Sequence, residues 1–129
     1  MTAVDLSQTA LDIAKTKSNI NINWIQSDIL NLPSTLGQFD LIFDRGCYHN
    51  IRYSIASQYV KSLSKLVHPN TKILIISCNS STPPGITKQH IRDDFSDLDF
   101  NIDYLENITG TDKLLKTQRD EWLLLLSII

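Results

Sequence analysis

Apolar, strand-like runs alternate with helix-like segments along most of this 129-residue chain. Short runs rich in Val, Ile, Leu and Phe predict strands, and apolar residues spaced three or four positions apart predict helices. The expected strands are Thr2–Asp5, Ile20–Gln26, Phe39–Phe43 and Lys72–Cys78, and the expected helices are Thr9–Lys17, Tyr53–Val67 and Thr87–Phe95. This alternation favours an α/β fold with a mostly parallel sheet and helices on both faces.

The last part of the chain follows a different pattern. Phe100–Asn107 and Glu121–Ile129 both have the composition of strands, and no helical pattern separates them. Consecutive strands without a crossover helix pair in an antiparallel way. We therefore expect a C-terminal antiparallel hairpin at one edge of the sheet, with Thr109–Asp120 as a mobile link. The length is that of one domain, residues 1–129.

The overall composition is that of an ordinary globular protein. Hydrophobic residues make up 42%, charged residues 20%, and the formal net charge is −2. Such a charge gives no electrostatic attraction to nucleic acid or to an anionic membrane. We expect a cytoplasmic protein with neither of these partners, because no signal peptide and no apolar run of transmembrane length is present. Two cysteines are too few for a disulfide framework.

Acidic residues follow the first two predicted strands. Asp5 ends the first, and an ionised carboxylate there can accept both hydroxyl hydrogens of a ribose. Asp28, just after the second, can accept from an exocyclic amine such as that of adenine. Each residue also has a structural interpretation, Asp5 as a helix N-cap acid and Asp28 as a turn aspartate.

The run FDLIFDRGCYHNI carries the most specific signal. Its strand is apolar enough to be buried on both faces, and Asp44 and Arg45 then emerge at the end where α/β sheets bind ligands. Gly46 would let the backbone approach a ligand, Tyr48 would form an aromatic wall, and His49 could act as an acid or base. The structural alternative is an Asp–Arg pair beside a buried aromatic. We expect no metal site, because no second His or Cys cluster occurs.

Taken together, these motifs resemble a known enzyme family. The segments VDLS, SDILNLP, FDLIFDRGCYHNI, LVHPN, KILIISC and EWLLLLSII, in this order, are similar to class I S-adenosylmethionine-dependent methyltransferases. The resemblance covers nearly the whole chain and is strongest to the small-molecule branch that includes thiopurine and tellurite-resistance methyltransferases. It implies a Rossmann-like sheet, S-adenosylmethionine as the cofactor, and transfer of a methyl group to a small molecule.

The resemblance also implies roles for individual residues. Asp5 and Leu6 would bind the cofactor's ribose, and Asp28 and Ile29 its adenine. The segment after the third predicted strand would line the methionine end and the acceptor pocket. There the cofactor-binding residues would be Asp44, Arg45 and Gly46, and the catalytic residues His49 and Asp44.

The sequence departs from the family at its front. The family's first strand, glycine-rich turn and following helix are absent from this chain, so we expect an N-terminally truncated, partial methyltransferase domain. That strand normally lies in the sheet centre, between Thr2–Asp5 and Phe39–Phe43. Either these two strands pair directly, or a second copy or a complementing chain fills the gap.

Other functions stay open at the level of sequence. The main alternative is a non-catalytic remnant, or the partner-binding module of a split methyltransferase. A nicotinamide-dinucleotide domain would also use Asp5 but depends even more on a glycine-rich turn, and a scaffold without ligand is a further alternative.

Overall fold

The computed structural model describes residues 1–79, 85–96, 100–112 and 117–129. Two compact units make up the chain, Met1–Leu36 and Gly37–Ile129.

The first unit is a small β-α-β arrangement. Strand β1 (Thr2–Asp5) pairs in parallel with β2 (Asn23–Gln26), with Asp5 opposite Gln26. Helix α1 (Gln8–Lys17) connects them. Ser7 caps it, because its hydroxyl accepts from the Ala10 N–H at 3.2 Å.

The predicted strand–helix–strand order of this unit is confirmed, but some of the predicted bounds and buried residues are wrong. Strand β2 is shorter than the predicted strand Ile20–Gln26. Of the apolar residues in the predicted helix Thr9–Lys17, Leu11 is buried but Ile13 is 52% exposed. Two 3₁₀ turns, η1 (Ile29–Asn31) and η2 (Ser34–Leu36), complete the unit.

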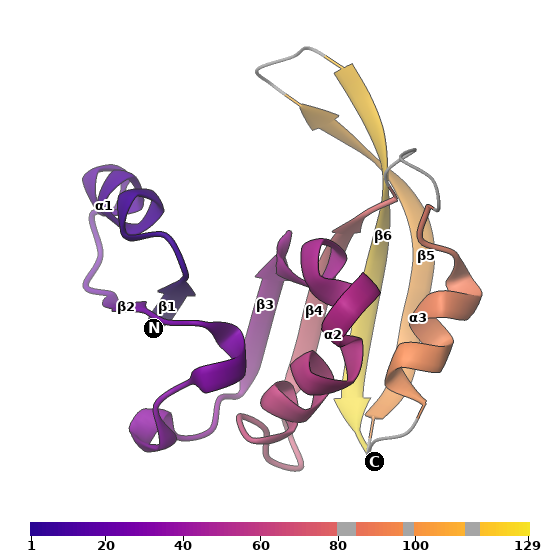
Figure 1. Cartoon of the computed structure of the whole chain (residues 1–129), viewed down its shortest axis with the longest axis horizontal. Coiled ribbons are helices and arrows are strands. Elements are labelled where there is room, and N and C mark those ends of the chain that lie inside the picture. The colour runs from indigo at the N-terminus through magenta and orange to yellow at the C-terminus, as the bar shows by residue number, and fades with distance from the viewer. Residues whose placement is uncertain (80–84, 97–99, 113–116) are drawn as a thin grey trace. The chain divides into compact units, whose positions relative to one another are not determined.

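The second unit contains a four-stranded sheet (Figure 1). Its order is β3-β4-β6-β5, with β3 and β4 parallel and β6 antiparallel to both β4 and β5. The strands are β3 (Leu41–Arg45), β4 (Lys72–Cys78), β5 (Phe100–Asp112) and β6 (Thr117–Ile128). The mixed sheet and its closing hairpin confirm the predicted α/β class with a C-terminal antiparallel hairpin.

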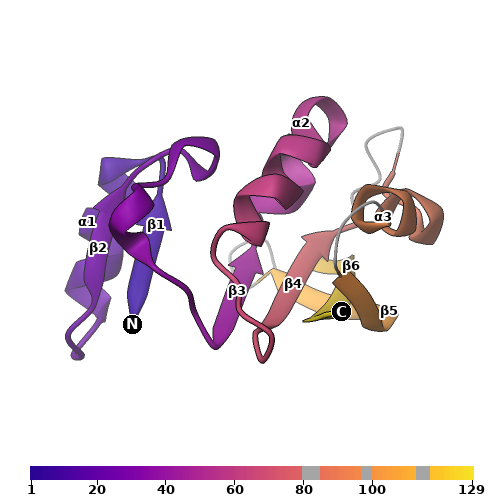
Figure 2. The ribbon, with the colours of Figure 1, turned by 90° about the horizontal axis from the view of Figure 1, so that it is seen from below.

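Helices α2 (Cys47–Ser64) and α3 (Lys88–Phe95) lie on the same face of this sheet (Figure 2). Alternate strand residues on that face are buried, among them Ile73, Ile75, Leu124 and Leu126. The opposite face of β3 carries Leu41 and Phe43, which are 63% and 57% exposed. The prediction that this strand is buried on both faces was therefore wrong.

The start of α2 was also misplaced. The helix begins at Cys47, whereas the sequence pattern predicted a start at Tyr53. The backbone of Ile55, inside α2, has φ −142° and ψ 27°, which are not helical values. This break explains why the helix start was predicted too far along the chain. The apolar spacing that marks the second half of α2 does not continue through the break into its first half.

The hairpin of β5 and β6 is longer than predicted. Pairing continues from Phe100↔Ile128 to Asp112↔Thr117, so 109–112 and 117–120 are strand rather than a mobile link. Residues 113–116 lie outside the described residues, as do 80–84 of the predicted loop Asn79–Gly85.

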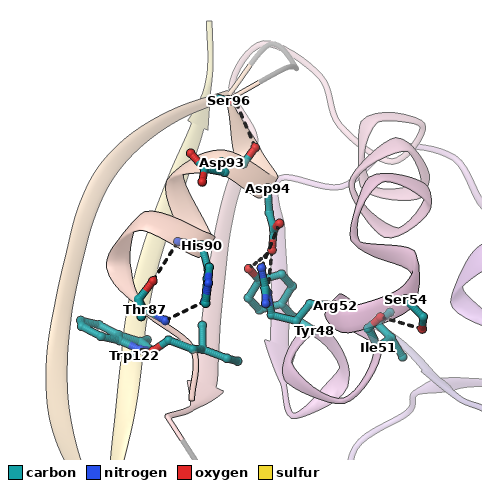
Figure 3. Close-up of polar contacts among 11 residues, drawn as sticks. Tyr48, Ile51, Arg52, Ser54, Thr87, His90, Asp93, Asp94, Ser96 and Trp122 are labelled. Carbon is teal, nitrogen blue, oxygen red and sulfur yellow. Dashed lines mark hydrogen bonds and ion pairs between the residues drawn. The ribbon is translucent and has the colours of Figure 1, made fainter. Parts of the chain in front are cut away.

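A polar cluster joins α2 to α3 (Figure 3). The Tyr48 hydroxyl donates to Asp94 Oδ2 at 2.6 Å, and Arg52 donates to both oxygens of Asp94 at 2.8 and 3.2 Å. Burial, assisted by Asp94, raises the pKa of Tyr48, so the phenol stays protonated.

Two contacts then fix the start of α3 (Figure 3). Thr87 and His90 form a reciprocal capping box, so the N-cap lies at Thr87, the residue with which the predicted helix Thr87–Phe95 begins. The Trp122 indole N–H donates to the Ile86 carbonyl at 2.7 Å. Together these bonds hold α3 against β6.

Candidate functional site

The first predicted ligand edge belongs to the unit Met1–Leu36. Asp5 is the last residue of β1 and is exposed, and the adjacent Leu6 is 70% exposed. One Asp5 oxygen, Oδ1, accepts from the Ser7 N–H at 2.7 Å. A carboxylate has about four lone-pair sites, so accepting capacity remains for the hydroxyls of a ribose. The exposed Leu6 offers apolar surface beside it.

Asp28 lies at the same edge of this small sheet. It follows β2 by two residues, and parallel β1 and β2 place their carboxyl ends side by side. Its carboxylate caps η1 by accepting from the Leu30 N–H at 2.9 Å, and Ile29 beside it is half-buried. The structure thus brings together the predicted adenine residues Asp28 and Ile29 with Asp5 and Leu6.

Asp44, the second predicted ligand acid, has a different environment in the unit Gly37–Ile129. It is buried, and both of its oxygens accept hydrogen bonds. Oδ1 accepts from the Cys47 N–H at 2.8 Å, and Oδ2 accepts from the Tyr48 N–H at 2.9 Å and the Tyr59 hydroxyl at 2.5 Å. Burial, with the charge of Asp44, raises the pKa of Tyr59. Asp44 therefore anchors the first turn of α2.

The backbone turns sharply after this acid. Gly46 is the N-cap of α2 and has φ +103°, a left-handed conformation that other residues adopt only with strain. Tyr48, predicted as a wall of the site, is fully buried against Tyr59 and Phe95. It belongs to the core, as the structural alternative for this segment proposed.

His49 lies in the first turn of α2 and contacts the end of β4. Its Nδ1 accepts from the Cys78 N–H at 3.1 Å. A backbone N–H can only donate, so Nδ1 is unprotonated and the ring hydrogen is on Nε2. Burial lowers the pKa of His49, and Arg119 lowers it further, while Asp44 and Glu121 act in the opposite direction.

The sequence analysis missed a charged group at the same end of the sheet. Glu121 of β6 is only 4% exposed, and its Oε1 lies 3.5 Å from Arg45 Nη2 and 3.9 Å from Arg119 Nε. The one available signal was an acid directly before the apolar run WLLLL. Nothing in the sequence indicated that Arg45 would meet a residue 76 positions later.

Comparison with known proteins identifies the family. A family model described as a methyltransferase domain matches residues 1–70, which is more than half of the chain. The chain belongs to this methyltransferase domain family. The match includes Asp5, Asp28 and the segment from Asp44 to His49.

Curated relatives agree with this assignment. An uncharacterized methyltransferase of Schizosaccharomyces pombe is 36% identical over 77 residues, covering 56% of this chain and 52% of its own. EEF1A lysine methyltransferase 2 of Danio rerio is 33% identical over 92 residues, covering 61% of this chain and 38% of its own. The chain spans about half the length, or less, of the curated relatives it matches.

Solved structures share the fold at low sequence identity. A SAM-dependent methyltransferase from Methanosarcina mazei has a TM-score of 0.81 at 10% identity, covering 99% of this chain and 81% of that one. The N-methyltransferase NodS from Bradyrhizobium japonicum, in complex with S-adenosylhomocysteine, has a TM-score of 0.71 at 17% identity, covering 98% and 65%.

S-adenosylmethionine is accordingly the cofactor that family and fold imply. The donor set at the edge of β1 and β2 fits it, because Asp5 and Asp28 supply acceptors for hydroxyl and amine hydrogens beside apolar Leu6 and Ile29.

Among the described residues, no group of three or more His, Cys, Asp or Glu side chains is placed to hold a metal ion. No described helix is both long and apolar enough to cross a membrane.

Proposed function

We propose that this chain binds S-adenosylmethionine and transfers its methyl group to a small-molecule acceptor. The observation that carries the proposal is the pair Asp5 and Asp28, side by side at the carboxyl ends of two parallel strands. Asp5 would accept from the ribose hydroxyls and Asp28 from the adenine amine, with Leu6 and Ile29 as apolar cover.

The cofactor, when bound, supplies a methyl group on a sulfonium sulfur: an acceptor lone pair forms the new bond to carbon, and the carbon–sulfur electron pair returns to sulfur. Such a transfer depends mainly on holding donor and acceptor in line. Gly46 supports this by its left-handed turn, which keeps the backbone close to the end of β3. Asp44 supports it by fixing α2 through three hydrogen bonds.

Calorimetric titration with S-adenosylmethionine and with S-adenosylhomocysteine tests the proposal. We expect both to bind the wild-type chain, and Asp5→Ala to weaken binding about 30-fold, since hydrogen bonds to a charged group contribute roughly 1.5–3 kcal/mol. Asp12→Ala is the matched control, because Asp12 is an exposed acid of α1 in the same unit. The absence of binding at millimolar ligand would favour the alternative of a non-catalytic remnant.

We further propose that a strand from a second copy of the chain or from a complementing chain pairs with β3. Among the described strands, β3 pairs with β4, and the exposed Leu41 and Phe43 lie on this edge strand. An exposed apolar edge strand favours strand addition. Sedimentation velocity should show self-association or complex formation that Phe43→Lys abolishes and Tyr53→Lys, at an exposed aromatic of α2, does not. A monomer that neither associates nor binds a partner would contradict this.

A further inference from the structure

The buried carboxylate of Glu121 occupies space that the side chain of any residue other than glycine would fill at position 110. Gly110, on the neighbouring strand β5, lies beneath this carboxylate, and a Cβ at position 110 would overlap the carboxylate atoms. Glycine is scarce, with four in the whole chain, so its presence here matters. Glu121 pairs with Cys78 of β4, which places it at the carboxyl end of that parallel strand. This is the end where α/β sheets bind ligands.

Two arginines share one oxygen of this carboxylate. Arg45 Nη2 lies 3.5 Å and Arg119 Nε lies 3.9 Å from Glu121 Oε1. Both contacts are long, and the two arginine side chains are 53% and 45% exposed, whereas that of Glu121 is 6% exposed. Two positive charges and one negative charge leave the group with a net charge of +1. Because each guanidinium has five N–H donors in a planar fork, both can also donate to a group arriving from solvent.

His49 adds a neutral donor to this group. Its ring interacts electrostatically with Asp44, Arg119 and Glu121, and its Nδ1 accepts from the Cys78 N–H. While that bond persists, His49 presents an N–H at Nε2 and has no lone pair with which to remove a proton. Asp44 is poorly suited as a base as well, because it is 8% exposed and three of its roughly four lone-pair sites already accept hydrogen bonds. The side chains at this end of the sheet are therefore better suited to binding an anion than to deprotonating an acceptor.

We propose that Arg45, Arg119 and His49, arranged around Glu121, bind a carboxylate carried by the methyl acceptor. An arginine holds a carboxylate through two parallel hydrogen bonds, and such charge-assisted bonds are about twice as strong as neutral ones. Glu121 limits the net charge of the group and keeps the two guanidinium groups near each other. The group orients the acceptor, and no proton transfer to His49 takes place. The identification of the ligand as the methyl acceptor rests on the proposed function. The binding of a carboxylate by these residues does not.

Benzoate and benzamide form a matched pair of probes, because they share a ring and differ in charge. Titrated into the full chain and followed by amide NMR shifts, benzoate should bind at least tenfold more tightly than benzamide. Arg119→Gln should weaken benzoate binding about tenfold, whereas Arg92→Gln, which removes the same charge from an exposed position of α3, should not. Equal affinities for the two probes, or equal effects of the two variants, would overturn the proposal.

Imidazole ¹⁵N spectra give a second readout that does not depend on activity. We expect His49 to show a protonated Nε2 and an unprotonated Nδ1 at neutral pH, and its Nε2 signal to shift with benzoate and not with benzamide. An unprotonated Nε2 in the benzoate-bound chain would rule out the donor role. Calorimetry with S-adenosylmethionine separates the two proposals: loss of cofactor binding with intact benzoate selectivity would reject the proposed function alone.

Discussion

The acids at the two predicted ligand edges are held in opposite ways. Asp5 and Asp28, in the unit Met1–Leu36, are exposed or half-exposed, and each accepts one local backbone N–H within two residues. Asp44, in the unit Gly37–Ile129, is buried and accepts from two backbone N–H groups and a tyrosine 15 positions away. Asp5 and Asp28 therefore keep lone pairs that can accept hydrogen bonds from a ligand, whereas Asp44 uses its lone pairs for hydrogen bonds that stabilise the fold. Position at a strand end therefore does not by itself define a ligand-binding acid.

The largest expected effect tests the structural side of this comparison. Asp44→Asn places an amide N–H against donors that need an acceptor, so we expect a loss of about 3 kcal/mol in the free energy of unfolding. Urea denaturation measures it. Asp40→Asn is the matched control, at an aspartate whose side chain is 98% exposed and contacts His68 Nε2 at 3.1 Å. A loss below 1 kcal/mol for Asp44→Asn would show that the buried network does not stabilise the fold.

A smaller effect is expected at Asp94, the acid between α2 and α3. Tyr48→Phe removes one of its donors without changing the aromatic packing, and Arg52 still compensates the charge. We expect a loss of about 1.5 kcal/mol, measured by urea denaturation. Tyr53→Phe, at an exposed tyrosine of the same helix, should change the stability by less than 0.5 kcal/mol, in keeping with roughly neutral surface substitutions.

The sequence predicted more of the framework than of the site. Strand–helix alternation and the C-terminal hairpin follow from local periodicity, and the structure contains them. The start of α2 did not follow, because its N-terminal half is organised by Asp44 and Tyr59 rather than by apolar spacing. Exposure of Leu41 and Phe43 also could not be predicted, since both α2 and α3 cover the other face.

For the site, the sequence identified single residues and missed their partners. Asp5 and Asp28 are local features at strand ends, so their placement could be predicted. Glu121 reaches Arg45 only because β6 enters the sheet beside β4. Such a meeting depends on strand order, which a single sequence with no repeated pattern does not determine.

A modest pH effect is expected from His49. Because burial lowers its pKa below the ordinary 6.5, the unfolded chain protonates before the folded one. The stability contributed by neutral His49 is thus complete above pH 6.5 and decreases as the pH falls toward the lower pKa of the folded chain. Thermal melts from pH 7.5 to 5.5 should show this loss, and His49→Gln should reduce it. An unchanged slope in the variant would assign the effect to another group.

The smallest effect is expected for the exposed acids, and it sharpens the comparison most. Asp5→Asn and Asp28→Asn should each change the free energy of unfolding by no more than about 0.5 kcal/mol, because asparagine caps a turn as well as aspartate does. The same variants should measurably weaken the binding of S-adenosylmethionine, as measured by calorimetry. A large stability loss with unchanged cofactor affinity would reverse the roles assigned to the two edges.

The position of β6 has a consequence for how the molecule forms. This strand is the last in the sequence but is interior in its sheet, between β4 and β5. The hydrogen-bonded pairing of β4 with β6 joins Lys72 to Ser127. Strand β4 can therefore pair on this side only with a segment that lies about fifty residues later in the sequence. During synthesis, β4 would emerge with one edge open, and the sheet could close only once β6 had left the ribosome. Closure of this sheet should therefore be a late step in the folding of the unit.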